Sequence, residues 1–151
     1  MRTLLSTLFP ATADNKIRGA KLPAYVFAVL AVISTVRSCV HIFAPDGGAG
    51  SIAGIDLSGS GAPGIVFAFA LWGSAQLVYA LVQLAVAFRY RSLVAAMYLL
   101  LLVETLLRML VGHLKPITFT HTPPGAIGNQ VILPLSLVML GACLWTANRE
   151  V

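Results

Sequence analysis

The sequence predicts an all-α membrane protein, an antiparallel bundle of four transmembrane helices with both termini in the cytoplasm. The 151 residues are 58% hydrophobic and 10% charged, whereas soluble domains average about 45–50% apolar and about 25% charged residues. Four segments reach the length of about 20 apolar residues that is needed to cross a bilayer. Short connections leave a single integral membrane domain over residues 1–151 and no room for a soluble catalytic module.

The positions of lysine and arginine predict the orientation of the bundle. Only Lys115 lies in the two loops expected outside, whereas the other basic residues beyond the spans flank their opposite ends. These residues are Arg2, Lys16, Arg18, Lys21, Arg89, Arg91 and Arg149. Cytoplasmic loops carry an excess of basic residues, so both termini are expected inside. The same rule accounts for the net charge of +5 without a nucleic-acid partner.

The first residues resemble the start of a signal peptide but lack its long apolar region. The apolar stretch from Thr3 to Phe9 is short and is interrupted by Pro10, whereas a signal peptide has an unbroken apolar region of about 7–15 residues. We expect Thr3 to Phe9 to form a short amphipathic segment on the cytoplasmic leaflet, where the nearby basic residues favour anionic lipid. A frayed tail is the alternative.

The first span, residues 22–44, carries a polar stripe in an apolar segment. The stripe recurs at i, i+3, i+4 and i+7, which is one face of a helix, and consists of Ser34, Arg37, Ser38 and His41. The external connection over residues 45–63 is rich in glycine. We expect it to be a flexible lid with Asp46 and Asp56 in water, because long connections without their own secondary structure are often functional.

The second and third spans, residues 64–88 and 93–112, are joined by the turn "RYRS". A turn this short is typical of an antiparallel helical hairpin, so the two spans are expected to be adjacent. One face of the second span bears Trp72, Gln76, Tyr79 and Gln83. In the third span Glu104 and Arg108 are i,i+4 neighbours, whose side chains can reach each other.

The second external connection, residues 113–126, has turn chemistry at both ends. Pro116 ends the third helix, and "PPG" at 123–125 forces a turn before the fourth span. That span, residues 127–147, begins with the polar pair Asn129 and Gln130. The two cysteines, Cys39 and Cys143, are expected near opposite ends of their spans, too far apart for a disulfide.

The polar residues of the four spans fall at similar depth, which predicts a common site in the outer half of the bilayer. Counted from the cytoplasmic ends at 1.5 Å per residue, Arg37, Glu104 and Arg108 lie at about 17–23 Å. Intramembrane charges usually face the bundle interior and pair, so Glu104 is expected to pair with both arginines. The cluster then keeps one positive charge. The predicted ligand-binding residues are Arg37, His41, Trp72, Gln76, Glu104, Arg108 and Gln130.

Three interpretations of this cluster remain open from the sequence. The site could bind a lipid, a quinone or another lipophile with an anionic or polar head, which makes the chain a binding or accessory protein. Alternatively, the Arg–Glu–Arg cluster is architectural in a structural subunit, whose apolar face is covered by a membrane-protein partner or a second copy. The third interpretation, a membrane oxidoreductase component, requires a cofactor that the residues do not identify.

The residues predict no metal site and name no reaction. The three histidines and two aspartates expected on the outer side have no recognised ligand spacing, and redox "CxxC" motifs are absent. Glu104 is the one carboxylate within the spans, so paired acid–base chemistry lacks a second group. The cofactor is therefore unassigned, and an enzyme is the less favoured class.

Several short motifs resemble small uncharacterised bacterial four-helix membrane proteins and, loosely, the DoxX-like group. They are the Trp/Gln-bearing second span, the basic turn "RYRSLV", "ETLLR" in the third span, and "KP" and "TPPGA" before the last helix. The resemblance covers residues 25–147. It implies a four-helix bundle in the bacterial cytoplasmic membrane, sometimes associated with quinone-linked oxidoreductase systems, with Arg37, Glu104 and Arg108 as the matching residues.

Overall fold

The computed structural model describes residues 2–17 and 19–147, and this part of the chain is helical with no strand. Four long helices are apolar and long enough to cross a membrane, and each lies within a few residues of a predicted span. The chain is thus a polytopic membrane protein. Its elements are α1 (Arg2–Leu8), α2 (Lys21–Phe43), α3 (Ala62–Arg89), the 3-10 turn η1 (Arg91–Leu93), α4 (Val94–Leu114) and α5 (Pro124–Ala147).

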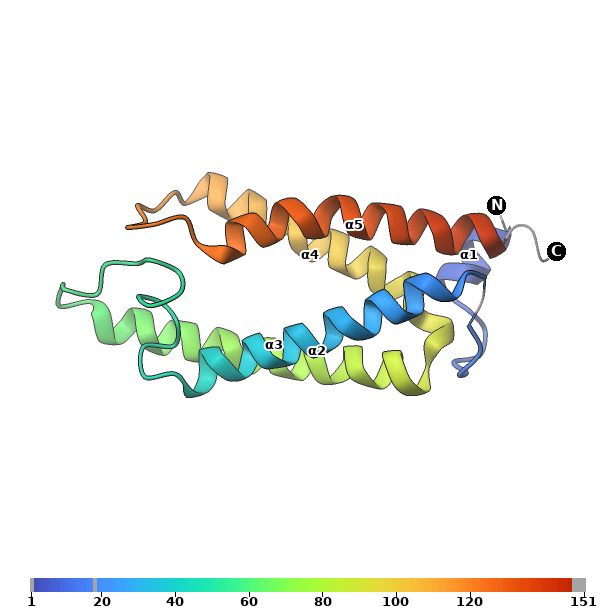
Figure 1. The fold of residues 1–151 in the computed structure, drawn as a ribbon, viewed down its shortest axis with the longest axis horizontal. Helices are drawn as coiled ribbons and strands as arrows, with labels where there is room; N and C mark the ends of the chain where they lie inside the picture. The colour runs from blue at the N-terminus through green and yellow to red at the C-terminus, as the bar shows by residue number, and fades with distance from the viewer. Residues whose placement is uncertain (1, 18, 148–151) are drawn as a thin grey trace.

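The long helices form two antiparallel pairs, α2 with α3 and α4 with α5 (Figure 1). Helix α1 and the C-terminal end of α5 lie at one end of the bundle, which we call the terminal end. The connections 44–61 and 115–123 lie at the opposite end, the loop end. Two of the basic residues used to predict orientation, Arg18 and Arg149, lie outside the described residues.

The apolar core joins the two pairs in the half of the bundle nearest the terminal end. Phe27 of α2 and Tyr98 of α4 are fully buried and pack edge to face, with ring centroids 5.7 Å apart. The Tyr98 hydroxyl donates a hydrogen bond of 2.8 Å to the carbonyl oxygen of Pro23. Met139 and Cys143 of α5 complete this cluster. Within the described part of the chain, neither Cys143 nor Cys39 forms a disulfide.

The tight turn after α3 keeps α3 and α4 adjacent only near that turn. Most helix packing occurs within the two pairs, and α3 and α4 diverge toward the loop end (Figure 1). The prediction that the second and third spans are adjacent is therefore correct at the terminal end alone. Their facing sides carry Trp72, Gln76 and Tyr79 on α3 and Glu104 on α4. Large polar and aromatic side chains do not allow the close helix contact that small residues permit.

Close contact between α2 and α3 depends on Gly73. A Cβ at this position would lie 2.6 Å from the Cβ of His41 and 3.2 Å from the carbonyl oxygen of Ser38. His41 is buried in the same interface, where its ring lies 5.1 Å from the Trp72 ring. Its Nδ1–H donates a 2.7 Å hydrogen bond to the carbonyl oxygen of Gly47, which attaches the following loop to the helix.

The N-terminal segment packs against the terminal end of the bundle. Helix α1 contacts α5 and α4. It contains most of the segment Thr3 to Phe9, with Phe9 just beyond its end, and the expected position of this segment on the cytoplasmic leaflet stays a prediction. Asp14 and Ser92 exchange hydrogen bonds: the Asp14 amide donates to Ser92 Oγ at 2.9 Å, and the Ser92 amide donates to the Asp14 carbonyl at 3.2 Å. The linker before α2 is thus attached to the turn between α3 and α4.

The glycine-rich connection at the loop end has a defined internal hydrogen-bond network. The Asp46 carboxylate accepts hydrogen bonds from the amides of Gly48, Gly50 and Ser51, at 2.7–3.2 Å, and from the Ser51 hydroxyl at 3.1 Å. Gly47 and Gly48 have positive φ values of 60° and 73°, a conformation that side chains with a Cβ disfavour. The donors around Asp46 lower the pKa of its carboxyl group to about 2.

An Asp46→Asn substitution is expected to loosen this connection at neutral pH. A neutral amide accepts these hydrogen bonds more weakly than a carboxylate, so amide hydrogen exchange over residues 47–52 should become several-fold faster. Because the pKa in the folded protein lies below the ordinary 3.8, the wild-type contribution is present above pH 4 and lost as pH falls toward 2. A carboxyl NMR titration of Asp46 should show this midpoint.

Asp56→Asn is the matched control, because its carboxylate accepts a backbone hydrogen bond from Ser58 alone. Equal exchange rates in the Asp46→Asn protein, the Asp56→Asn protein and the wild type would contradict the assigned role of Asp46.

Candidate functional site

An open groove of about 370 Å³ lies between α3 and α4 where the two helices diverge. Its walls combine apolar and aromatic side chains with an amide, a phenol and a carboxylate. They are Trp72, Ala75, Gln76 and Tyr79 of α3 and Leu100, Val103, Glu104 and Leu107 of α4. Ligand sites are typically lined by apolar groups with a few polar groups that orient the ligand, and the groove has this composition.

The predicted pairing of Glu104 with Arg108 is confirmed. Glu104 Oε1 lies 3.3 Å from Arg108 Nη1, and both side chains are partly exposed. Arg108 Nη2 also donates to Oγ1 of Thr105 at 3.3 Å, and Thr105 is fully buried. One turn of α4 thus positions the carboxylate beside the groove, and the ion pair lies within a single helix.

The predicted pairing of Glu104 with Arg37 is not a direct ion pair, although the two charges interact at longer range. Both residues are described, and no ion pair joins them; instead the guanidinium carbon of Arg37 lies 5.9 Å from the centroid of the Trp72 ring. A cation over the face of a tryptophan is attracted by the ring quadrupole. The reason for the difference is the pairing of the helices, because α2 packs on α3 and brings Arg37 to α3 instead of α4.

Several buried polar atoms around the groove have no hydrogen-bond partner among the residues that the structure describes. Both Oε1 and Nε2 of Gln76 are in this state, as are the Nε atoms of Arg37 and Arg108. A buried polar group left unsatisfied costs about 1–3 kcal/mol, so each atom favours an additional partner. Gln76 can both donate and accept, whereas the two arginines can only donate.

Four of the seven predicted site residues do not line the groove, and two of these, His41 and Gln130, form no hydrogen bond or ion pair with Gln76 or Glu104 within the described part of the chain. His41 is buried between α2 and α3, where it bonds Gly47 and stacks near Trp72. Gln130 is exposed on the first turns of α5, and it does not line the groove. The structure therefore brings together Trp72, Gln76 and Glu104 as lining residues, with Arg108 and Arg37 in contact with them.

The apolar half of the groove was not predicted, because spacing along a helix is the one feature that its residues share in the sequence. Leu100, Val103, Glu104 and Leu107 recur at i, i+3, i+4 and i+7 on α4, the spacing of one helix face. In a span composed almost entirely of leucine and valine, no contrast in polarity distinguishes this face from those in contact with lipid. Only the separation of α3 from α4 exposes it as a groove.

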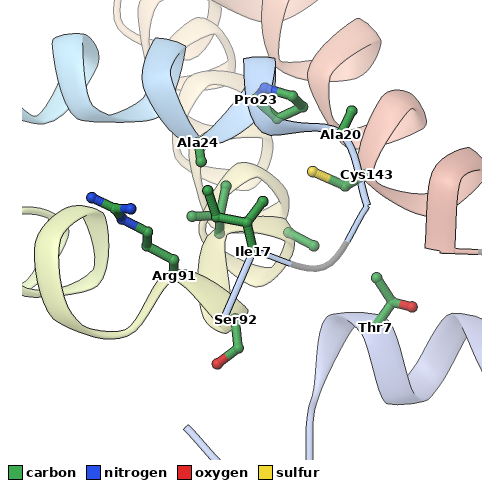
Figure 2. Close-up of a pocket in the computed structure, with 10 residues that line it drawn as sticks. Thr7, Ile17, Ala20, Pro23, Ala24, Arg91, Ser92 and Cys143 are labelled. Atoms are coloured by element: carbon green, nitrogen blue, oxygen red, sulfur yellow. The ribbon is translucent and has the colours of Figure 1, made fainter. Parts of the chain in front are cut away.

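A second hollow at the terminal end is too small for an organic ligand. Its volume is about 10 Å³, close to the smallest space that holds one water molecule. Figure 2 shows that the linker residues Ile17 and Ala20, the start of α2 and Cys143 of α5 surround it. The α3–α4 groove is accordingly the better candidate site.

Metal ligands do not gather in the described part of the chain, where no group of three or more His, Cys, Asp or Glu side chains could hold an ion. Comparisons with protein-family models, curated proteins and solved structures return no match. The DoxX-like resemblance stays a prediction.

Proposed function

We propose that this protein binds a lipophile with an anionic or polar head, such as a lipid or a quinone, in the α3–α4 groove. The observation that carries the proposal is the Gln76 amide, whose two polar atoms are buried at the groove without a partner. The tail of the ligand would lie against Leu100, Val103 and Leu107 of α4. This makes the chain a binding or accessory protein of the membrane.

The charges near the groove favour an anionic head over a cationic one. Arg37 and Arg108 contribute two positive charges and Glu104 one negative charge. Arginine remains protonated in proteins, so the cluster retains a net positive charge. Charge-assisted hydrogen bonds from arginine to a carboxylate or phosphate are stronger than those between neutral groups.

The geometry gives less support to a purely architectural cluster. An ion pair that fixes the register of two helices must join them, whereas Glu104 and Arg108 are both on α4. The contact that joins helices is that of Arg37 on α2 with Trp72 on α3, and Gly73 and His41 already hold these two helices together.

The proposed location is a bacterial cytoplasmic membrane with the terminal end of the bundle in the cytoplasm. Lys16, Lys21, Arg89 and Arg91 all belong to this end, and the positive-inside rule supports the orientation. The groove then opens in the outer half of the bilayer, beneath the two external loops.

Native mass spectrometry with lipid extraction, on protein purified gently from membranes, tests the binding function. Wild-type protein should retain a defined small molecule, and Gln76→Leu and Arg108→Gln should each lower its occupancy at least tenfold, about 1.4 kcal/mol of binding free energy. Gln76→Leu is the sharper variant. It removes two unsatisfied atoms, so the melting temperature should hold or rise while the ligand is lost.

Arg89→Gln is the matched control, because it removes an exposed arginine at the terminal end of α3, far along the helix from Gln76. It should leave retention unchanged. If wild type and variants release the same bulk phospholipid and Arg108→Gln only lowers the melting temperature, the cluster is architectural and the binding proposal fails.

A further inference from the structure

Hydrogen bonds between the two external connections join the helix pairs at the loop end. The Thr120 amide and hydroxyl donate to the carbonyl oxygen of Gly54, at 2.8 and 3.1 Å. His121 Nε2 lies 3.2 Å from the carbonyl oxygen of Ile52. We call these four residues the loop clasp. It links the α2–α3 connection to the α4–α5 connection above the space where the pairs diverge.

The loop clasp has one close contact, between Gly54 and His121, whereas the side chains of Thr120, His121 and Ile52 are exposed. Gly54 has a φ of +69°, and a Cβ at this position would lie 2.9 Å from the His121 ring. The connection on the α2 side is held in turn by the His41–Gly47 hydrogen bond and by the donors around Asp46. These two hydrogen-bond networks of the first connection hold the backbone to which the clasp is attached.

The opposite end of the groove is closed by the core. Phe27 and Tyr98 are fully buried there, Leu101 is nearly so, and the Tyr98 hydroxyl is bonded to Pro23. A solute from the cytoplasmic side would have to pass through this dense packing, and protein interiors contain few voids larger than a water molecule.

The side of the groove between α3 and α4 remains open. Its rim residues Leu100, Val103 and Leu107 are 49%, 46% and 55% exposed, and Trp72 is 41% exposed. These residues belong to helices that span the bilayer, so their exposed side chains contact the acyl chains of lipids. An opening in this position admits molecules dissolved in the membrane.

We infer that the groove is filled sideways, through the gap between α3 and α4, by an anionic lipid of the surrounding leaflet. The inference rests on the proposed function and names its ligand class and route. The acyl chain enters along Leu100, Val103 and Leu107. Arginine side chains have apolar stems that let the charged head reach toward the interface, so Arg37 and Arg108 supply the positive charge for the head. The core blocks the cytoplasmic side, and the loop clasp joins the two helix pairs on the external side.

Trp72 can report this occupancy by fluorescence, because the chain contains two tryptophans and Trp145→Phe leaves Trp72 alone. The protein is reconstituted in vesicles that contain increasing fractions of phosphatidylglycerol brominated in its acyl chain, which quenches tryptophan on contact. A second series of vesicles contains zwitterionic phosphatidylcholine that carries the same brominated acyl chain. Acrylamide serves as the quencher in water.

The matched control combines Trp145→Phe, Trp72→Phe and Leu71→Trp, which places the single tryptophan at an exposed neighbouring position of α3. Brominated phosphatidylglycerol should half-quench Trp72 at a mole fraction at least about threefold lower than the control tryptophan requires. It should also act at a lower mole fraction than brominated phosphatidylcholine. Equal quenching curves for Trp72 and the control tryptophan, or for the two brominated lipids, would overturn the inference.

A variant with an open clasp tests the route. Thr120→Pro with His121→Ala removes the Thr120 amide and hydroxyl donors and the His121 ring from the clasp. Acrylamide quenching of Trp72 should increase, while quenching by brominated phosphatidylglycerol should stay the same. If acrylamide already reaches Trp72 fully in the closed protein, the route is aqueous and the inference is wrong. A molecule retained in mass spectrometry would leave the proposed function standing in that case.

Discussion

A Gly73→Leu substitution is expected to force α2 and α3 apart and to leave little folded protein. Even the Cβ of alanine would lie 2.6 Å from His41 Cβ and 3.2 Å from backbone atoms of α2, so no rotation of a side chain can relieve the overlap. Overpacking of this kind costs about 1–3 kcal/mol, which we expect for Gly73→Ala, and more for leucine. Thermal unfolding in detergent, followed by circular dichroism, measures the loss.

Gly112→Ala is the matched control, because Gly112 is an exposed glycine of α4 whose Cβ would have no neighbour within 4 Å. It should leave the melting temperature unchanged or raise it, since alanine is the better helix former. If Gly73→Ala and Gly112→Ala melt at the same temperature, close packing at Gly73 does not hold the α2–α3 pair.

Tyr98→Ala is expected to cost about 3–5 kcal/mol, the range for removing a buried aromatic side chain. Tyr98 is fully buried, packs on Phe27, and hydrogen-bonds the carbonyl oxygen of Pro23. It lies where the two helix pairs meet, so its loss weakens the contact between them. Tyr98→Phe keeps the ring and removes the hydroxyl, and should cost only about 1 kcal/mol because one hydrogen bond is lost.

Tyr25 provides the comparison on α2, because its side chain is 59% exposed. Tyr25→Ala should lower the melting temperature far less than Tyr98→Ala. The assignment of Tyr98 to the shared core would be contradicted if the two alanine variants lost equal stability, or if Tyr98→Phe were as damaging as Tyr98→Ala.

The polar residues of the spans show which part of the site could be predicted from the sequence. Glu104 and Arg108 pair as expected, because i,i+4 geometry is a property of any helix and does not depend on its neighbours. Glu104 and Arg37 do not form the expected direct ion pair and interact only at longer range. That contact depends on which helices are adjacent, and equal depth in the membrane does not determine the rotation of each helix about its own axis.

Gln130 illustrates the same limit. It has the depth and polarity of a site residue, but it is exposed on α5 and away from the groove. His41 likewise lies on the predicted polar stripe of α2, yet the close contact at Gly73 draws it into the α2–α3 interface. A helical repeat identifies a polar face, whereas the partner of that face depends on packing.

Composition and hydropathy by themselves determined the all-α membrane class, the four spans and their ends to within a few residues. These properties follow from the bilayer, which requires about 20 apolar residues per crossing and leaves backbone groups no partner outside a helix. Only the tertiary structure decided that α2 pairs with α3 and α4 with α5, that α3 and α4 diverge into a groove, and that two loops join above it. These features arise from contacts between residues distant in sequence, such as Gly73 with His41, Tyr98 with Pro23 and Thr120 with Gly54. The helical repeats of the spans identify polar faces, but they do not specify which residues of another helix or loop those faces contact.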